Sequence, residues 1–174
     1  TAPDDYSPVV GTATIAAGTT ATSLSISVVN DSLDELDEMF TVSLSNPTGG
    51  AIISATAGSA TVTILDDDPG PSLSIADVSV SEDAANATLT ITQDSPSGLD
   101  VTVDYATSDG TATAPDDYVA SSGTATIPAG AASVTITVPI IDDALDEVDE
   151  TFTVTLSNPT GGGIIAAGAA TVTV

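Results

Sequence analysis

The chain has 174 residues, and its 25 Asp and Glu residues are accompanied by no Lys, Arg or His, which gives a formal net charge of −25 at pH 7. A protein without cationic side chains cannot neutralise phosphates, so this charge excludes nucleic acid as a partner and excludes direct docking on an anionic membrane. The absence of Cys excludes disulfides and thiolate sites, and the 41% apolar content is too high for disorder driven by charge alone.

Residues 1–65 are predicted to be the C-terminal part of a repeat, because their sequence returns later in the chain. The motif of residues 1–6 returns at 113–118, an offset of 112 residues, and the motif of residues 44–50 returns at 156–162. A period of this length corresponds to a whole domain rather than to one turn of a short-repeat solenoid.

The first strands of this repeat are absent from residues 1–65, so we do not expect the half-repeat to hold a closed core alone. Two explanations remain open. In one, the chain is a piece of a long tandem array whose boundary falls inside a repeat. In the other, a second copy of the protein supplies the missing strands, as in β-strand complementation.

The half-repeat ends in a predicted strand over residues 61–65, and an acidic, proline-containing segment over residues 66–71 follows it. Proline restricts the backbone, so residues 66–71 predict a short, stiff linker between two domains. Residues 72–174 are then a nearly complete copy of the repeat. We expect the whole chain to be a segment of a longer protein.

Alternating apolar and polar residues predict strands throughout the second repeat, and no segment has helical periodicity. The clearest strands are predicted over residues 87–93, 101–106, 133–139, 152–157 and 170–174. Turn signals such as Asp109-Gly110 separate them. About seven short strands in about 100 residues are typical of an immunoglobulin-type sandwich. The predicted fold class is therefore all-β, with tandem immunoglobulin-like antiparallel β-sandwiches.

The acidic residues form clusters at the ends of the predicted strands, where a sandwich gathers its loops. Four groups recur: the Asp before Tyr, the pair that closes an apolar strand, the Leu-Asp-Glu-x-Asp-Glu hairpin, and the triplet Asp66-Asp67-Asp68. Carboxylates crowded without basic partners repel one another unless a cation is supplied. All-oxygen ligand sets from several converging loops suit Ca²⁺. These clusters predict a calcium site.

The acidic residues also permit two other interpretations. A strongly acidic surface also occurs in solvated or salt-adapted proteins that bind no metal. Paired carboxylates could in principle hydrolyse glycosides. The chain, however, has no His, Cys, Lys, Arg or Trp, and few aromatic residues that could bind a sugar. We therefore predict that the protein is not an enzyme.

Several motifs in the same order resemble the Calx-beta family, the calcium-binding modules of sodium/calcium exchangers, which are also found in bacterial surface proteins. They cover essentially the whole chain. The motifs are Ser108-Asp109-Gly110-Thr111-Ala112, Asp116-Asp117-Tyr118, Gly123-Thr124-Ala125-Thr126-Ile127, Ile140-Ile141-Asp142-Asp143, Asp149-Glu150-Thr151-Phe152, Leu156-Ser157-Asn158 and Thr63-Ile64-Leu65-Asp66-Asp67-Asp68.

The resemblance implies a set of calcium ligands in each repeat. In the second repeat the implied ligands are Glu82, Asp117, Asp142, Asp143, Glu147 and Glu150. In the first repeat they are Asp5, Asp31, Glu35, Glu38, Asp66, Asp67 and Asp68. Asn30 stands where the family has the first Asp of a pair, which removes a charge. The first repeat lacks its early Glu, and the second ends before its closing triplet.

The sequence thus predicts a calcium-binding, tandem-repeat structural segment of an extracellular bacterial adhesin, surface fibre or filament, located outside the cell or on its surface. Calcium at the poles between domains would stiffen the array. The expected partners are neighbouring repeats of the same protein, with strand complementation between copies as the open alternative. The alternative function is a calcium-sensing regulatory module of a larger membrane or signalling protein.

Overall fold

The computed structural model describes residues 5–144 and 147–174, and these residues form strands, turns and loops without any helix. No helix that could cross a membrane is therefore found in this part of the chain. The start of the repeated motif at Thr1 and the pair Leu145-Asp146 lie outside the described residues. The chain divides into two units, Thr1–Ser32 with Leu36–Asp67 and Leu33–Glu35 with Asp68–Val174.

The first unit contains a two-stranded antiparallel sheet and no buried core. β1 (Glu38–Ser43) pairs with β2 (Ser59–Ile64), and an isolated antiparallel bridge joins Tyr6 to Val28. The rings of Tyr6 and Phe40 stack with centroids 4.0 Å apart. None of the described residues of this unit is buried. The described residues of this unit therefore have local strand pairing but no buried side chain.

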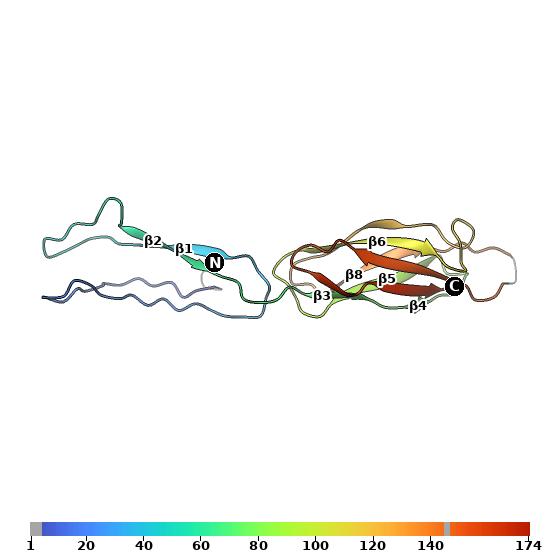
Figure 1. The fold of residues 1–174 in the computed structure, drawn as a ribbon, viewed down its shortest axis with the longest axis horizontal. Coiled ribbons are helices and arrows are strands. Elements are labelled where there is room, and N and C mark those ends of the chain that lie inside the picture. Colours follow the sequence, from blue (N-terminus) through green and yellow to red (C-terminus); the bar gives the residue numbers. More distant parts are fainter. Residues whose placement is uncertain (1–4, 145–146) are drawn as a thin grey trace. The chain divides into compact units, whose positions relative to one another are not determined.

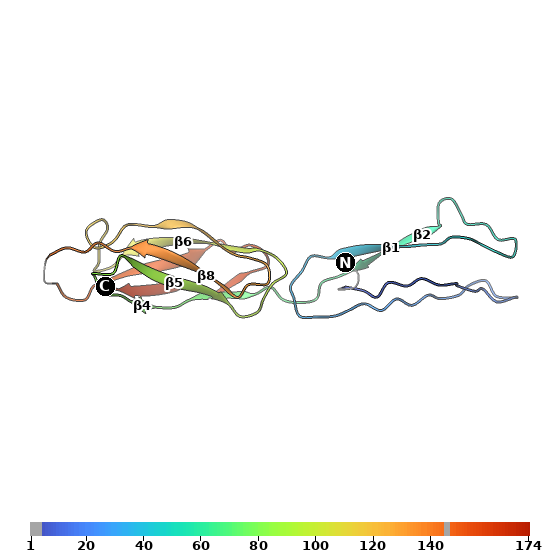
Figure 2. The ribbon, with the colours of Figure 1, turned by 180° about the vertical axis from the view of Figure 1, so that it is seen from behind.

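The second unit is a sandwich of two sheets, which confirms the predicted all-β fold (Figure 1). One sheet has the order β10 (Ile164–Ala167), β3 (Ser72–Ile75), β5 (Asn86–Gln93) and β8 (Ser133–Pro139). The other has the order β4 (Val78–Ser79), β11 (Ala169–Thr173), β9 (Thr151–Ser157), β6 (Val101–Asp109) and β7 (Ser122–Ile127). Figure 2 shows β5 and β8 side by side from behind.

Most neighbouring strands are antiparallel, but the sheet edges depart from the strictly antiparallel pattern that the sequence predicts. β10 pairs with β3 in parallel, and β11 pairs with β4 in parallel. Each parallel pair joins a strand from the start of the repeat to one from its end. Such pairs depend on contacts far apart in the chain, which residue alternation does not encode.

Alternation along the strands builds the core from both sheets. In β5, Ala87, Leu89 and Ile91 are buried while the threonines between them are exposed, because successive side chains of a strand point to opposite faces. β5 and β8 match their predicted ranges to within one residue. β6 runs on to Asp109, three residues past its predicted end, because Thr107, Ser108 and Asp109 still pair with β9.

The predicted linker is divided between the two units. Asp66 and Asp67 belong with the first unit, and Asp68 belongs with the second. Pro71 has a fully buried side chain. The backbone of Gly70 passes so close to that of Gly162 that a side chain at Gly70 would collide with the Gly162 carbonyl. The end of the segment is thus packed as part of the sandwich.

Candidate metal centre

Three loops meet at one end of the second unit, where the C-terminus also lies (Figure 1). Backbone hydrogen bonds anchor these loops to neighbouring segments of the chain. Ile141 N donates to Asp117 O at 2.9 Å, which joins the end of β8 to the loop before Tyr118. Glu150 and Val174 exchange two N–H···O bonds of 2.9 Å, which join the acidic loop to the end of β11. The acidic residues of this end are therefore presented by anchored backbone.

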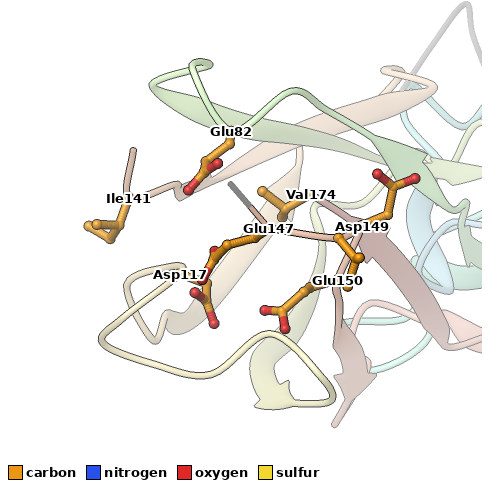
Figure 3. A pocket seen from close by; sticks show the side chains of 8 residues that line it. Glu82, Asp117, Ile141, Glu147, Asp149, Glu150 and Val174 are labelled. Atoms are coloured by element: carbon orange, nitrogen blue, oxygen red, sulfur yellow. The ribbon is translucent and has the colours of Figure 1, made fainter. Parts of the chain in front are cut away.

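These loops enclose an acidic pocket of about 150 Å³. Its lining consists of Glu82, Asp117, Ile141, Glu147, Val148, Asp149, Glu150 and Val174. Figure 3 shows the Glu147 and Glu150 carboxylates directed toward the side of the pocket that carries Asp117, whereas Asp149 points away from it. The pocket brings together acids from the loop after β4, the loop before Tyr118 and the loop before β9.

The pocket raises the pKa values of two of its carboxyl groups. Desolvation is the largest cause for Glu147, followed by the negative charges of Asp143, Asp117, Glu82 and Glu150. Desolvation is also the largest cause for Glu150, and the charge of Asp117 and a hydrogen bond with it come next. Both effects disfavour the ionised form. A cation in the pocket would reverse the repulsive part of both shifts.

The loop that carries Asp117 is held by a buried tyrosine. Tyr118 Oη donates to Asp109 Oδ1 at 2.6 Å, and Ala114 N donates to the same oxygen at 3.1 Å. The Tyr118 ring stacks on Phe152 with centroids 4.0 Å apart. Desolvation and the Asp109 hydrogen bond raise the pKa of Tyr118 to about 12. The sequence predicted a turn at Asp109-Gly110 but not the bond between Asp109 and Tyr118.

Of the six ligands implied for the second repeat, four line the pocket: Glu82, Asp117, Glu147 and Glu150. Asp143 lies near enough to raise the pKa of Glu147 by its charge. Asp142 is exposed and does not line the pocket. Asp149, which is not among the implied ligands, also lines the pocket, with its carboxylate turned outward. The apolar residues Ile141, Val148 and Val174 complete the lining.

The ligands implied for the first repeat are divided between the two units. Asp5, Asp31, Glu38, Asp66 and Asp67 belong with the first unit, and Glu35 and Asp68 belong with the second. Within the first unit, Asp66 N donates to Asp37 Oδ1 at 3.1 Å. Asp37, which is not among the implied ligands, therefore helps to position the start of the acidic triplet.

The donor set fits a hard divalent cation such as Ca²⁺ in its chemistry, because the pocket offers only carboxylate oxygens that repel one another. Across the described ranges 5–144 and 147–174, no three or more acidic side chains are close enough together to hold a metal ion. The carboxylates thus converge on one pocket without forming a closed ligand cage.

The sequence profile of the Calx-beta domain matches residues 1–68 and 72–174 of the chain. Among solved structures, the chain is similar to the apo form of the Calx CBD1 domain, with 24% identity and a TM-score of 0.53 over 59% of this chain and 96% of the other. This likeness concerns the fold alone. No curated protein matches the chain.

Two related structures share more of the sequence. The CBD12 structure from CALX1.2 is 28% identical, with a TM-score of 0.55 over 59% of this chain and 42% of the other. The calcium binding domain CBD12 of CALX1.1 is 28% identical, with a TM-score of 0.54 over 58% of this chain and 44% of the other. The chain therefore spans less than half the length of these two structures.

Proposed function

The chain belongs to the Calx-beta domain family over residues 1–68 and 72–174, and on this premise we propose that it is a calcium-binding, tandem-repeat structural segment. The segment would serve an extracellular bacterial adhesin, surface fibre or filament. A second repeat of nearly the same sequence follows the first at an offset of 112 residues, which supports an array of similar modules. A chain without Lys or Arg also lacks trypsin cleavage sites, which suits exposure outside a cell.

One observation carries the calcium proposal. Glu82, Asp117 and the pair Glu147 and Glu150 come from three separate loops, yet they line one pocket. Nearby negative charges contribute to raising the pKa values of Glu147 and Glu150. No cationic side chain exists in the chain to relieve this repulsion. A bound Ca²⁺ supplies positive charge, and these residues would hold it through their carboxylate oxygens.

The mechanism is electrostatic ordering rather than chemistry on a substrate, and no catalytic role is proposed. Asp117 is held in place by the anchored Tyr118 next to it. Glu150 is held by its two backbone bonds to Val174. Glu147 lies in the loop between β8 and β9, and it lines the same pocket as Asp117 and Glu150. Neutralising the charges would fix this loop against the sandwich and stiffen the end of each repeat.

The test is thermal unfolding of the full chain with 1 mM Ca²⁺ or with EDTA, where the calcium concentration is an order-of-magnitude choice for extracellular sites with Kd values of about 10⁻⁴ to 10⁻³ M. Binding of this strength stabilises by about 1 kcal/mol per site. We expect calcium to raise the Tm of the second unit by about 4 °C or more, and Mg²⁺ to raise it less. An unchanged Tm in EDTA would falsify the proposal.

A pair of variants assigns the effect to the pocket. Glu147→Gln with Glu150→Gln removes two charges that face the pocket, and should abolish most of the calcium-dependent rise in Tm while stabilising the metal-free protein. Asp149→Asn makes the same kind of change in the same loop, but at a carboxylate that points away. This control should keep the rise. Equal losses in both would instead indicate a general charge effect.

The likeness to the calcium binding domain CBD12 of CALX1.1 favours a second candidate, a calcium-sensing regulatory module. The two functions differ in the protein that surrounds the segment. Many successive repeats in the full-length gene would support the structural array. A pair of repeats beside membrane-spanning segments would support the sensor.

A further inference from the structure

The two sheets of the second unit end, among the described residues, in the edge strands β4, β7, β8 and β10. An edge strand presents unpaired N–H and C=O groups, which proteins usually protect with short strands, bulges or charged side chains. β4 has two residues, and β10 has four residues and a register shift between Ile165 and Ala167. β7 and β8 have six and seven residues in regular register with their neighbours. Shortness and bulges therefore protect β4 and β10 but not β7 and β8.

Charged side chains do not protect β7 and β8 either. Residues 118–141, which include both strands, contain no charged residue, although 25 acids are distributed over the 174 residues of the chain. The equivalent interval of the first repeat, residues 6–30, is uncharged as well, and residues 11–15 have the same sequence as residues 123–127 of β7. The uncharged interval is therefore a feature of the repeated sequence rather than of one copy of it.

Part of the β8 edge is already occupied. Val119 N donates to Pro139 O at 2.9 Å, and Tyr118 forms an antiparallel bridge with Ile140. Pro139 also has no N–H that it could donate to another strand. β7, by contrast, pairs only with β6 among the described strands. The more open edge is therefore that of β7.

The backbone groups that β7 directs away from β6 follow from one printed bond. Thr107 N donates to Ser121 O at 2.9 Å, so the odd-numbered residues of β7 bond to β6, because the bonding direction alternates along an antiparallel pair. The N–H and C=O groups of Ser122, Thr124 and Thr126 are then directed outward. The side chains of these three residues are exposed. The edge thus offers backbone donors and acceptors beside uncharged hydroxyl groups.

We propose that the edge of β7 binds a second copy of this chain, with the two β7 strands paired antiparallel about a two-fold axis at Thr124. Ser122 of each copy would lie opposite Thr126 of the other, so that every bonded pair joins residues whose backbone groups point outward. A two-fold contact brings identical surfaces together. In a chain whose charges are all negative, such a contact avoids repulsion only where the surface is uncharged. Cross-strand pairs of threonine hydroxyls add to the backbone bonds.

Asp104, in the strand next to β7, is compatible with this pairing. It is the register partner of Thr124, and its Oδ1 accepts a hydrogen bond from Thr124 Oγ1 at 2.6 Å. The Asp104 residues of two paired copies would be separated by three strand spacings, about 14 Å. This distance exceeds the Debye length of about 8 Å at physiological ionic strength, but not that of about 30 Å at about 0.01 M. Pairing should therefore strengthen with added salt.

The test is the mass of the full 174-residue chain in EDTA, measured by sedimentation over a range of protein concentrations. We expect a dimer whose association constant rises about tenfold or more between about 0.01 M and about 0.5 M NaCl. On dimerisation, hydrogen–deuterium exchange should slow at the amides of Ser122, Thr124 and Thr126, but not at those of Thr135 and Thr137 in β8. A dimer without this protection overturns the proposal. So does a chain that stays monomeric, which would leave the edge to an extended segment of a different protein.

A charge placed on the edge locates the contact. Thr126→Asp should weaken dimerisation by more than about tenfold, because a charged side chain on an edge strand opposes pairing with another strand. Thr135→Asp is the matched control, because it makes the same change at an exposed position of β8, and it should retain the dimer. Equal weakening by both variants would indicate a general effect of charge and would contradict the assignment.

A second variant keeps the proposal testable if Thr126→Asp unfolds the chain. Thr126→Pro removes an outward N–H without adding charge, and edge strands tolerate proline where the N–H does not bond within the sheet. This variant should also weaken dimerisation, and a Thr126→Pro chain that dimerises like the parent counts against the proposal. The proposal extends the tandem-repeat function to copies that lie side by side, but dimerisation in EDTA does not depend on calcium. A salt-dependent dimer together with a calcium-insensitive Tm would retain this inference and reject the proposed metal function.

Discussion

At the scale of single residues, the bond between Tyr118 and Asp109 holds the loop that presents Asp117. The bond lowers the pKa of Asp109, together with the N–H of Ala114, and it contributes to raising the pKa of Tyr118. The two shifts have opposite signs because the bond is made by a neutral phenol and an ionised carboxylate. The bond therefore keeps its full strength only at pH values above those that protonate Asp109 and below those that ionise Tyr118.

The pH dependence of this bond follows from the signs. A tyrosine whose folded pKa is raised stabilises the fold below its unfolded pKa of 10.0, and this stability is lost as pH rises toward about 12. An aspartate whose folded pKa is lowered stabilises the fold above its unfolded value of 3.8, and this stability is lost as pH falls through the folded pKa.

Tyr118→Phe should reduce the free energy of unfolding at neutral pH by about 1.5 kcal/mol, because a hydrogen bond to a charged group is lost. The variant should also lose part of its alkaline sensitivity above pH 10.0. Urea unfolding at neutral and alkaline pH measures both effects. Tyr105→Phe, in β6, is the control and should keep the alkaline loss. A Tyr118→Phe chain as alkali-sensitive as the parent would contradict the assignment.

At the scale of secondary-structure elements, β1 and β9 are corresponding strands of the two repeats, but they lie in different environments. β9 lies between β11 and β6, and β1 has only β2 beside it among the described strands. Phe152 in β9 is buried, whereas Phe40 at the same position of β1 is partly exposed. The identical residue type should therefore contribute very different amounts to stability.

Phe152→Ala should cost about 3–5 kcal/mol, because it opens a cavity in the core and removes the ring stack with Tyr118. Phe40→Ala should cost less than half as much, since part of its ring is already in water. Chemical unfolding of the two variants, followed by the circular dichroism of the sheet, makes the comparison. Similar costs would mean that the first unit is covered in solution.

At the scale of the whole molecule, a net charge of −25 without any cation means that Coulomb forces within the protein are all repulsive. Such self-repulsion destabilises the compact state. The hydrophobic core of the second unit and the hydrogen bonds of its sheets must outweigh it. Proteins held by surface salt bridges respond to salt in the opposite sense, because screening weakens those attractions.

Added NaCl should therefore raise the Tm of the metal-free chain in EDTA. The Debye length falls from about 10 Å at about 0.1 M to about 3 Å at about 1 M, which removes most repulsion between separate loops. Tetramethylammonium chloride should act similarly, because screening does not require a specific site. Calcium should reach a larger effect at about a hundredfold lower concentration. A Tm that falls or stays constant with NaCl would refute this account.

The sequence by itself determined the all-β class, the repeat and the family. Alternation in Ala87–Gln93 and Ser133–Pro139 predicted β5 and β8, because alternation is a local property that reflects which face of a strand is buried. The repeat offset of 112 residues matches Tyr6 to Tyr118 and Phe40 to Phe152 from the sequence alone. The resemblance to the Calx-beta family, which rests on motifs in order, is confirmed by the profile match.

Only the tertiary structure decided which acids come together. Glu82 and Glu150 line one pocket, and Asp142 does not, because convergence depends on how distant loops are anchored to the sandwich. The parallel pairs of β3 with β10 and β4 with β11 were likewise beyond the sequence. They join strands about ninety residues apart, and no local pattern encodes such a pairing.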